Sequence, residues 1–405
     1  MKPIRAFLDK VRPNFEPGGR MSALGSVYEG FESFLYTPRT TSAPTLATHI
    51  HDAIDSKRAM IIVVLALMPC FFFGMYNTGY QHWLAAGQST FPFWSLMFYG
   101  LLAILPKVVV TYLVGLGIEF AVAQVKKEEI QEGFLVTGIL IPMICPVETP
   151  LWMLAVATAF AVIFAKEVFG GTGYNIVNVA LVARAFLFFA YPAQMSGDDV
   201  FVATGTMFGF GPEVADGFTC ATPLGQIAAS SGQPAELTGI GGHLITMWDA
   251  FIGLIPGSFG ETSTLCCMIG AAILLMSGIG SWRIMLSVLV GALFMGWIAN
   301  EFAATYPASY LKPGEQLLYG GLAFAGVFMA TDPVTACRTK LGKLIYGFLI
   351  GVIAVIIRTY NNGYPEGAML AVLLMNVFAS LIDWMVVRSN INRRRARLIS
   401  KTQKV

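Results

Sequence analysis

The chain has 405 residues, of which 56% are hydrophobic and only 12% are charged, and its formal net charge is +2. Because soluble domains average about 25% charged residues, this composition excludes an ordinary soluble protein, and nothing in it indicates a nucleic-acid partner. Several apolar runs approach the roughly 20 residues that cross a bilayer as a helix, so we interpret the chain as an all-α polytopic protein of the lipid bilayer.

Ten candidate spans follow one another along the chain. They are 59–79, 97–122, 134–149, 151–168, 174–192, 263–280, 284–300, 316–331, 344–358 and 367–387. They divide the chain into an N-terminal arm (1–58), a five-helix repeat (59–192), a loop (193–262), a second five-helix repeat (263–387) and a basic tail (388–405). The arm is charged and lacks the apolar core of a cleavable signal.

The placement of lysine and arginine predicts the topology. Both ends are basic, with Lys2, Arg5, Lys10, Arg12 and Arg20 at the start and Arg388, Arg393, Arg394, Arg395 and Arg397 at the end. Between Arg184 and Arg283 there is no lysine or arginine, whereas seven acidic residues occur there. Since basic residues concentrate on the cytoplasmic side, we predict a bacterial inner-membrane protein with both termini cytoplasmic and the loop outside the cytoplasm.

Two parts of the sequence resemble each other. GILIPMICPVETP and FAGVFMATDPVTA are short apolar runs ending in a Pro-Val turn. Each is followed by an apolar span and then by a Gly-Tyr segment that opens into another span, GTGYNIVNVALVARAF or NNGYPEGAMLAVLLMNVF. Because each half would hold an odd number of spans, the second is expected to be inverted. Inverted repeats with interrupted helices indicate a site between the halves; chance similarity of apolar segments is the alternative.

Charged residues also occur where the chain would lie in lipid. Glu148 and Asp332 stand at the two equivalent breaks, and Glu119, Arg184 and Asp383 lie within spans or near their ends. A carboxylate at membrane depth is costly and usually faces a cavity, a cation or a partner. The alternative for Glu148 and Asp332 is a helix end in the hydrated headgroup region, and Arg184 is a candidate structural counter-charge.

The longest polar loop contains DGFTCATPLGQ, residues 216–226. This stretch resembles the flavin-attachment motif in membrane subunits of the Na+-translocating NADH:quinone oxidoreductases and of the related Rnf complexes. FEPGGRMSALGSVYEGFESFLYTP, WDAFIGLIPGSFGETSTL and YPEGAMLAVLLMNVFASLID are also similar to the B-subunit family of the Na+-translocating enzyme. The resemblance covers nearly the whole chain, including the N-terminal arm.

This resemblance implies that a separate flavin transferase joins FMN, through a phosphoester, to the hydroxyl of Thr222. Gly217 would leave room for the phosphate, and Asp216 would help to position the group or metal used in the transfer. Thr219 is the rival hydroxyl, and Cys220 stands where the family usually has glycine. A threonine-rich external turn without a cofactor is the alternative.

The resemblance further implies a non-covalent riboflavin beside Asn175 and Asn178, near the cytoplasmic end of the fifth span. We expect the two amides to lie three residues apart on one helical face. Amide groups both donate and accept hydrogen bonds, as the edge of an isoalloxazine ring does. Capping or cross-linking of helices is the alternative role.

The quinone and the ion are placed by the same resemblance. Ubiquinone would bind near GLGIE, Gly115 to Glu119, and near Phe186 and Phe188, two aromatics that taken alone would face lipid. Leu116 stands where some members have a second glycine. The residues that the resemblance ties to cation passage are Glu29, Glu119, Asp332 and Asp383.

Together these features predict a membrane flavoprotein with two flavins that receives electrons from NADH through other subunits of a six-subunit complex and passes them to ubiquinone, coupled to cation transport. Whether Na+ or H+ moves stays open, because the same carboxylates bind either. No nucleotide-binding fingerprint occurs and the six cysteines show no metal spacing, so we predict no metal site and no catalytic side chain here. The alternatives are an Rnf-type flavoprotein and a non-redox channel or solute carrier.

Overall fold

A computed structural model describes residues 8–15, 56–126, 133–230, 236–302, 306–361 and 366–402, together with residues 19, 25, 28, 32 and 363. The secondary structure of these residues is helical, apart from two isolated β-bridges. This confirms the predicted all-α class. Glu29 and most of the arm 1–58 lie outside the described residues.

Six helices in the described part of the chain are long and apolar enough to cross a bilayer. Large apolar side chains such as Leu113, Trp152 and Val377 are exposed on their outer faces, which suits lipid, where a helix satisfies its own backbone hydrogen bonds. The six are α3 (Ser56–Ala85), α4 (Phe93–Lys126), α6 (Leu151–Ala161, continued by the π turn η3, Val162–Lys166, and the 3-10 turn η4, Glu167–Phe169), α12 (Trp282–Phe302), α15 (Lys340–Tyr360) and α16 (Ala368–Thr402).

The other four predicted spans contain shorter helices. They are α5 (Phe134–Ile144), α7 (Val179–Ala190), α11 (Thr264–Met276) and the turn α14 (Leu322–Phe324) with the π turn η7 (Ala325–Met329). The longest, α11, has 13 residues and covers about 20 Å, less than the hydrocarbon core of about 30 Å. The predicted spans 134–149, 174–192 and 316–331 were therefore too long as helices. Proline disfavours helical backbone in the residue before it. Pro146 therefore interrupts the first of these segments, and Pro333 follows the end of the third.

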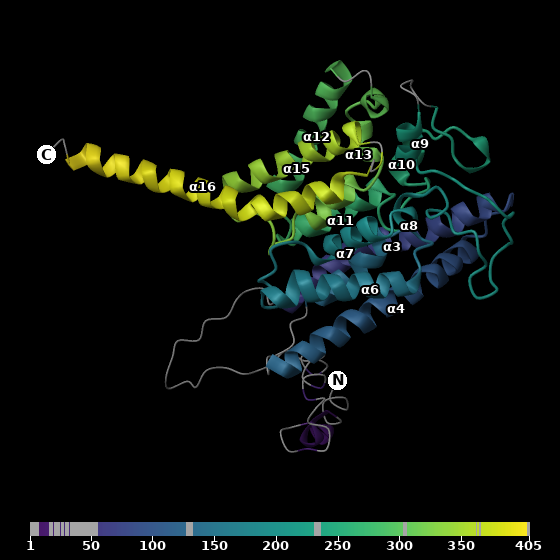
Figure 1. Ribbon diagram of the computed structural model, residues 1–405, viewed down its shortest axis with the longest axis horizontal. Helices are drawn as coiled ribbons and strands as arrows, with labels where there is room; N and C mark the ends of the chain where they lie inside the picture. The colour runs from purple at the N-terminus through teal and green to yellow at the C-terminus, as the bar shows by residue number, and fades with distance from the viewer. Residues whose placement is uncertain are drawn as a thin grey trace.

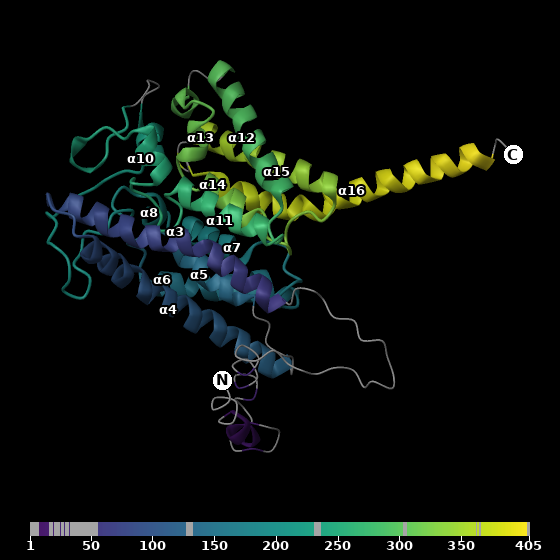
Figure 2. The same cartoon turned by 180° about the vertical axis from the view of Figure 1, so that it is seen from behind.

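The short helices lie between two groups of longer ones (Figures 1 and 2). α4 and α6 occupy one side and α12, α15 and α16 the other, with α3, α5, α7 and α11 between them. The last three elements of the two halves follow the same order, α5–α6–α7 and α14/η7–α15–α16, as the repeat predicted. Contacts between α3 and α11, and between α7 and α16, join the halves.

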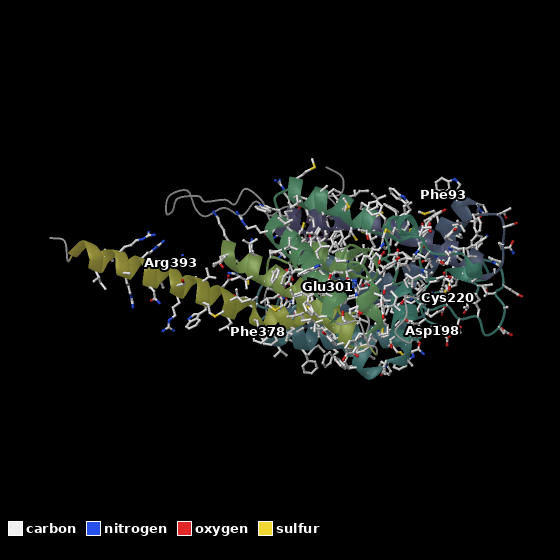
Figure 3. All side chains as sticks on the ribbon, turned by 90° about the horizontal axis from the view of Figure 1, so that it is seen from above. Phe93, Asp198, Cys220, Glu301, Phe378 and Arg393 are labelled. Carbon is white, nitrogen blue, oxygen red and sulfur yellow. The ribbon has the colours of Figure 1, made fainter. Side chains whose placement is uncertain are left out.

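The loop 193–262 gathers at the end opposite the C-terminal end of α16 (Figure 1). It contains α8 (Ala193–Ser196), α9 (Pro223–Ala229), the turn η5 (Ile240–Gly242) and α10 (Met247–Ile252). Figure 3 shows Asp198 and Cys220 at this end and Arg393 at the other. The predicted basic tail is described as a continuation of α16 as far as Thr402.

Candidate functional site

The predicted attachment loop buries Thr222, the predicted acceptor, and exposes other residues of the motif. Asp216, Gly217 and Thr219 are exposed, whereas Thr222 is only 8% exposed. Thr222 is the N-cap of α9, and its Oγ1 accepts a hydrogen bond from the Gly225 amide at 3.1 Å. Gly217 has a φ of 77°, a left-handed conformation that glycine adopts without strain, so the chain turns within the exposed part of the motif.

Cys220, where glycine was expected, fits this loop. Its backbone amide donates to the Asp198 carbonyl at 3.1 Å, and the two residues lie at the same end of the molecule (Figure 3). Burial raises the pKa of the Cys220 thiol, and the nearby Asp198 raises it further. The Cys220 thiol is therefore neutral, and a cysteine at this position is compatible with the fold of the loop.

Two small cavities meet at Thr222, with volumes of about 20 and 30 Å³, and Glu366 lines both. A phosphoester at this hydroxyl would lie beside the first amides of α9, a favourable position for an anion. Each cavity is close to the volume of one water molecule, so an isoalloxazine ring would have to lie over the exposed part of the loop. The residues around Thr222 therefore fit the phosphate group, and the isoalloxazine ring would lie outside the two cavities.

A buried charge cluster lies next to these cavities and joins the two halves. Arg184 of α7 donates to Glu261 Oε1 at 2.5 Å, to Glu366 Oε2 and to the carbonyl of Ile144 at the end of α5. Arg184 is 1% exposed and Glu261 is 6% exposed. The interpretation of Arg184 as a structural counter-charge is confirmed, whereas Glu261 and Glu366 were not predicted as its partners.

A larger cavity, of about 100 Å³, lies where α3 and α5 begin, toward the end of the helical body opposite the attachment loop. Its lining includes Asn175, Asn178, Lys166 and Asp332, together with apolar side chains such as Phe328. Amides around an apolar cavity suit a ring with a polar edge. Their chemistry fits riboflavin, although neighbouring side chains must shift to admit the whole ring.

The two asparagines do not share a helical face, so that part of the prediction was wrong. Asn175 precedes α7 and hydrogen-bonds within its own loop, from Nδ2 to the Val177 carbonyl at 3.2 Å. Asn178 is the N-cap of α7, where its Oδ1 accepts from the amides of Ala180 and Leu181. Asparagine is favoured at this position because its oxygen satisfies free amides of the first turn. Asn178 Nδ2 also lies 3.5 Å from Asp332 Oδ2, across the two halves.

The GLGIE stretch lies on α4, and its first and last residues, Gly115 and Glu119, face protein. The Gly115 Cα packs against the Phe134 ring of α5, so closely that a Cβ would overlap it. Glu119 is 5% exposed and forms a buried ion pair with Lys166 of η3. Lys166 was not predicted as a partner, and it also lines the larger cavity.

Phe186 and Phe188 are half-buried on α7. Phe186 stacks on Phe160 of α6 with 4.6 Å between ring centroids, and Phe188 contacts Phe189 edge to face at 5.4 Å. Neither is fully exposed, unlike Phe189 at 72%. Phe186 therefore packs between α6 and α7, on a different helix pair from Gly115.

Asp332 and Asp383 both bind the segment that follows η7. Asp332 accepts hydrogen bonds from the Val334 amide at 3.0 Å and from Thr335 Oγ1 at 3.1 Å. Asp383 of α16 accepts from the Arg338 amide at 2.6 Å and from Thr339 Oγ1 at 2.6 Å. The two carboxylates thus hold this non-helical segment, one from within it and one from α16.

Lys107 is a buried cation that was not predicted from the sequence. Lys107, in the middle of α4, is 6% exposed and donates to the carbonyls of Pro146 and Val147, at 3.1 Å for Pro146. These carbonyls follow α5, where helical hydrogen bonding has ended. A lysine inside the apolar run LLAILPKVVV was the available signal, because ionisable residues at membrane depth are rare and need partners.

Comparisons with known proteins place the chain in a family. A family profile described as "NQR2, RnfD, RnfE family" matches residues 44–392. The chain is 44% identical to a protein of Ectopseudomonas mendocina that is named as the B-subunit of Na(+)-translocating NADH-quinone reductase, over 97% of this chain and 99% of that protein. Proteins of the same name from Pseudomonas paraeruginosa and Yersinia pestis are 43% and 42% identical, with the same coverage. The chain therefore belongs to the NQR2, RnfD, RnfE family.

Proposed function

We propose that this chain is the membrane flavoprotein of a respiratory complex that oxidises NADH, reduces ubiquinone and exports Na+. The proposal rests on two features at opposite ends of the same helical body. At one end, the Thr222 hydroxyl of the attachment motif lies beside the buried cluster around Arg184. At the other end lies the amide-lined cavity. The names of the relatives support the same function.

When bound, FMN and riboflavin supply reversible electron transfer. Thr222 contributes the ester oxygen, and the Gly225 amide that now donates to this oxygen lies beside the position of the phosphate. Asn175 and Asn178 bind the polar edge of the second ring. Lys166, which lines that cavity and pairs with Glu119, connects the ring site to the proposed quinone stretch on α4.

The placement in the cell follows from the charge distribution. The basic end of α16 would face the cytoplasm of a bacterium and the lysine-free loop the opposite side of the inner membrane. The other subunits of a six-subunit complex would deliver electrons from NADH, and a flavin transferase would attach FMN during maturation. An Rnf-type flavoprotein remains the alternative within the family, whereas a passive channel would need neither Thr222 nor the amides.

The ion function is tested with the complex in sealed vesicles. We expect Asp332→Ala and Asp383→Ala each to lower NADH-driven Na+ uptake several-fold and to reduce the Na+ dependence of turnover. Covalent FMN should stay attached in both variants, and riboflavin should stay bound in Asp383→Ala, whose side chain is not among the residues that line the amide-lined cavity. The reason is that each carboxylate holds the segment between η7 and α15 from which the path would be built. Exposed Glu301, replaced by alanine, is the control. Unchanged Na+ dependence in both aspartate variants would reduce them to structural residues.

The sidedness is tested by a reporter inserted after Ser230, in the loop that follows α9. We expect alkaline phosphatase, which is active only outside the cytoplasm, to be active at this position. A cytoplasmic reporter such as green fluorescent protein should be dark there and bright after Thr402. The reverse pattern would overturn the proposed orientation.

A further inference from the structure

Among the described residues that line the amide-lined cavity, Lys166 is the only lysine or arginine. It ends the π turn η3 and is 5% exposed. The other charged residue in the lining is Asp332, whose carboxylate accepts hydrogen bonds from Val334 and Thr335. Because a buried charge needs a counter-charge, a ligand that becomes negative in this cavity would depend on Lys166.

The ammonium of Lys166 has hydrogen-bonding capacity left for such a ligand. An ammonium carries three donors, and among the described residues only Glu119 Oε1 accepts a hydrogen bond from it. Glu119 is also 5% exposed, but it is not among the residues that line the cavity. Since the lysine stem is flexible, Lys166 can contact Glu119 on one side and a ligand in the cavity on the other.

Reduction changes the charge of an isoalloxazine ring. The oxidised ring is neutral, whereas the fully reduced ring is a weak acid that carries a negative charge above neutral pH. A charged group near the ring nitrogens is one of the means by which a protein tunes a flavin, and charges interact more strongly in a buried site than in water. A cation in the wall of the cavity therefore favours the reduced ring over the oxidised ring.

We propose that Lys166 stabilises the reduced form of the riboflavin ring and shares its ammonium between this ring and Glu119. The inference rests on the proposed function, because that function assigns riboflavin to this cavity. A negative ring would draw the ammonium away from Glu119, and a buried carboxylate that loses its counter-charge needs another. The charge of the ring and the charge of Glu119, on the proposed quinone stretch, are therefore linked.

The test measures the affinity of the riboflavin-depleted complex for added riboflavin by equilibrium dialysis above neutral pH. One series uses the oxidised ring, and the other uses dithionite-reduced riboflavin without oxygen. Chromatography separates riboflavin from flavins that carry phosphate. Lys166→Met should weaken binding of the reduced ring about tenfold more than binding of the oxidised ring. Glu119→Gln should shift the ratio of the two affinities in the opposite direction, because the ammonium is then left to the ring alone.

Two further variants serve as controls. Lys166→Met leaves Glu119 buried without its partner, which lowers stability, whereas Lys166→Met combined with Glu119→Gln removes both charges. The affinity ratio of this double variant should lie between those of the single variants. Lys126, the last residue of α4, pairs with Glu167 and is not among the lining residues of the cavity. Lys126→Met removes the same charge and should leave the ratio unchanged.

The sign of the shifts decides the outcome. Opposite shifts of the affinity ratio in Lys166→Met and Glu119→Gln support the inference, since a damaged fold would weaken binding of both ring forms alike. Equal weakening of both forms in Lys166→Met, or shifts of the same sign in the two variants, would overturn it. If the unmodified complex binds riboflavin in neither form, the proposed function fails instead, and the cavity is not a flavin site.

Discussion

Replacing Thr222 by alanine should abolish the covalent flavin fluorescence of the denatured chain in a gel. A phosphoester needs one specific hydroxyl, and the loop buries the Thr222 hydroxyl at the start of α9. Thr222→Ser should retain part of the signal, because a serine hydroxyl can attack the same phosphorus and is an equally good N-cap. Non-covalent riboflavin should survive in both variants, since Asn175 and Asn178 line a different cavity.

The structure supplies a control for this experiment. Thr222→Ala also removes the cap of α9, which costs about 1 kcal/mol, so loss of flavin could reflect a disordered loop. Thr222→Asn keeps a capping oxygen and has no hydroxyl, and it should lose the flavin as completely as alanine does. Thr219→Ala, at an exposed position, should weaken the signal at most. Flavin retained by Thr222→Asn would show that the ester is elsewhere.

Replacing Arg184 by methionine should lower the free energy of unfolding of the protein by about 3–5 kcal/mol, the usual cost of removing one partner from a buried ion pair. The substitution leaves Glu261 and Glu366 without the guanidinium that contacts both, and it leaves the Ile144 carbonyl without this donor. Thermal unfolding of the purified complex and the amount of the protein in the membrane measure the effect.

Two further variants test whether unpaired charge causes this decrease in the free energy of unfolding. Arg393→Met removes an equivalent charge from the exposed end of α16 and should change stability by less than about 0.5 kcal/mol. Combining Arg184→Met with Glu261→Gln and Glu366→Gln removes the unpaired charges and should recover part of the stability. If the triple variant is as unstable as Arg184→Met alone, packing of the arginine stem, and not charge, is the cause.

The helical segments could be predicted from the sequence because lipid leaves few alternatives. A backbone in hydrocarbon must satisfy its hydrogen bonds internally, so each apolar run became a helix, and the Pro-Val turns marked the breaks. The helix lengths were less predictable. Asn178, for example, reads as part of an apolar helical run, yet its side chain begins α7 by accepting from Ala180 and Leu181, so the residues before it are not helical.

The buried ion pairs could not be found in the same way. Lys166 and Glu119 are 47 residues apart, and Arg184 is 77 residues from Glu261 and 182 from Glu366. Each of these charged side chains stands out in an apolar part of the sequence, but the pattern along the chain does not indicate which charged residues pair with each other. The partners are set by how the two halves pack, and so the sequence predicted Arg184 as a counter-charge without naming its carboxylates.

The π turn η3 accommodates one extra residue ahead of the Lys166–Glu119 pair. A π turn holds an extra residue compared with an α turn, and each residue of an α-helix advances by about 100°. Because the wider turn absorbs the extra residue, Lys166 keeps nearly the orientation that it would have in a regular helix one residue shorter. If the same residues from Val162 to Lys166 were wound as ordinary α-helix, Lys166 would rotate by up to about 100°, away from Glu119. The local type of helix therefore matters here as much as residue identity: a homologue that keeps both charged residues and the extra position but winds this segment as regular α-helix would lose the contact while preserving every side chain that makes it.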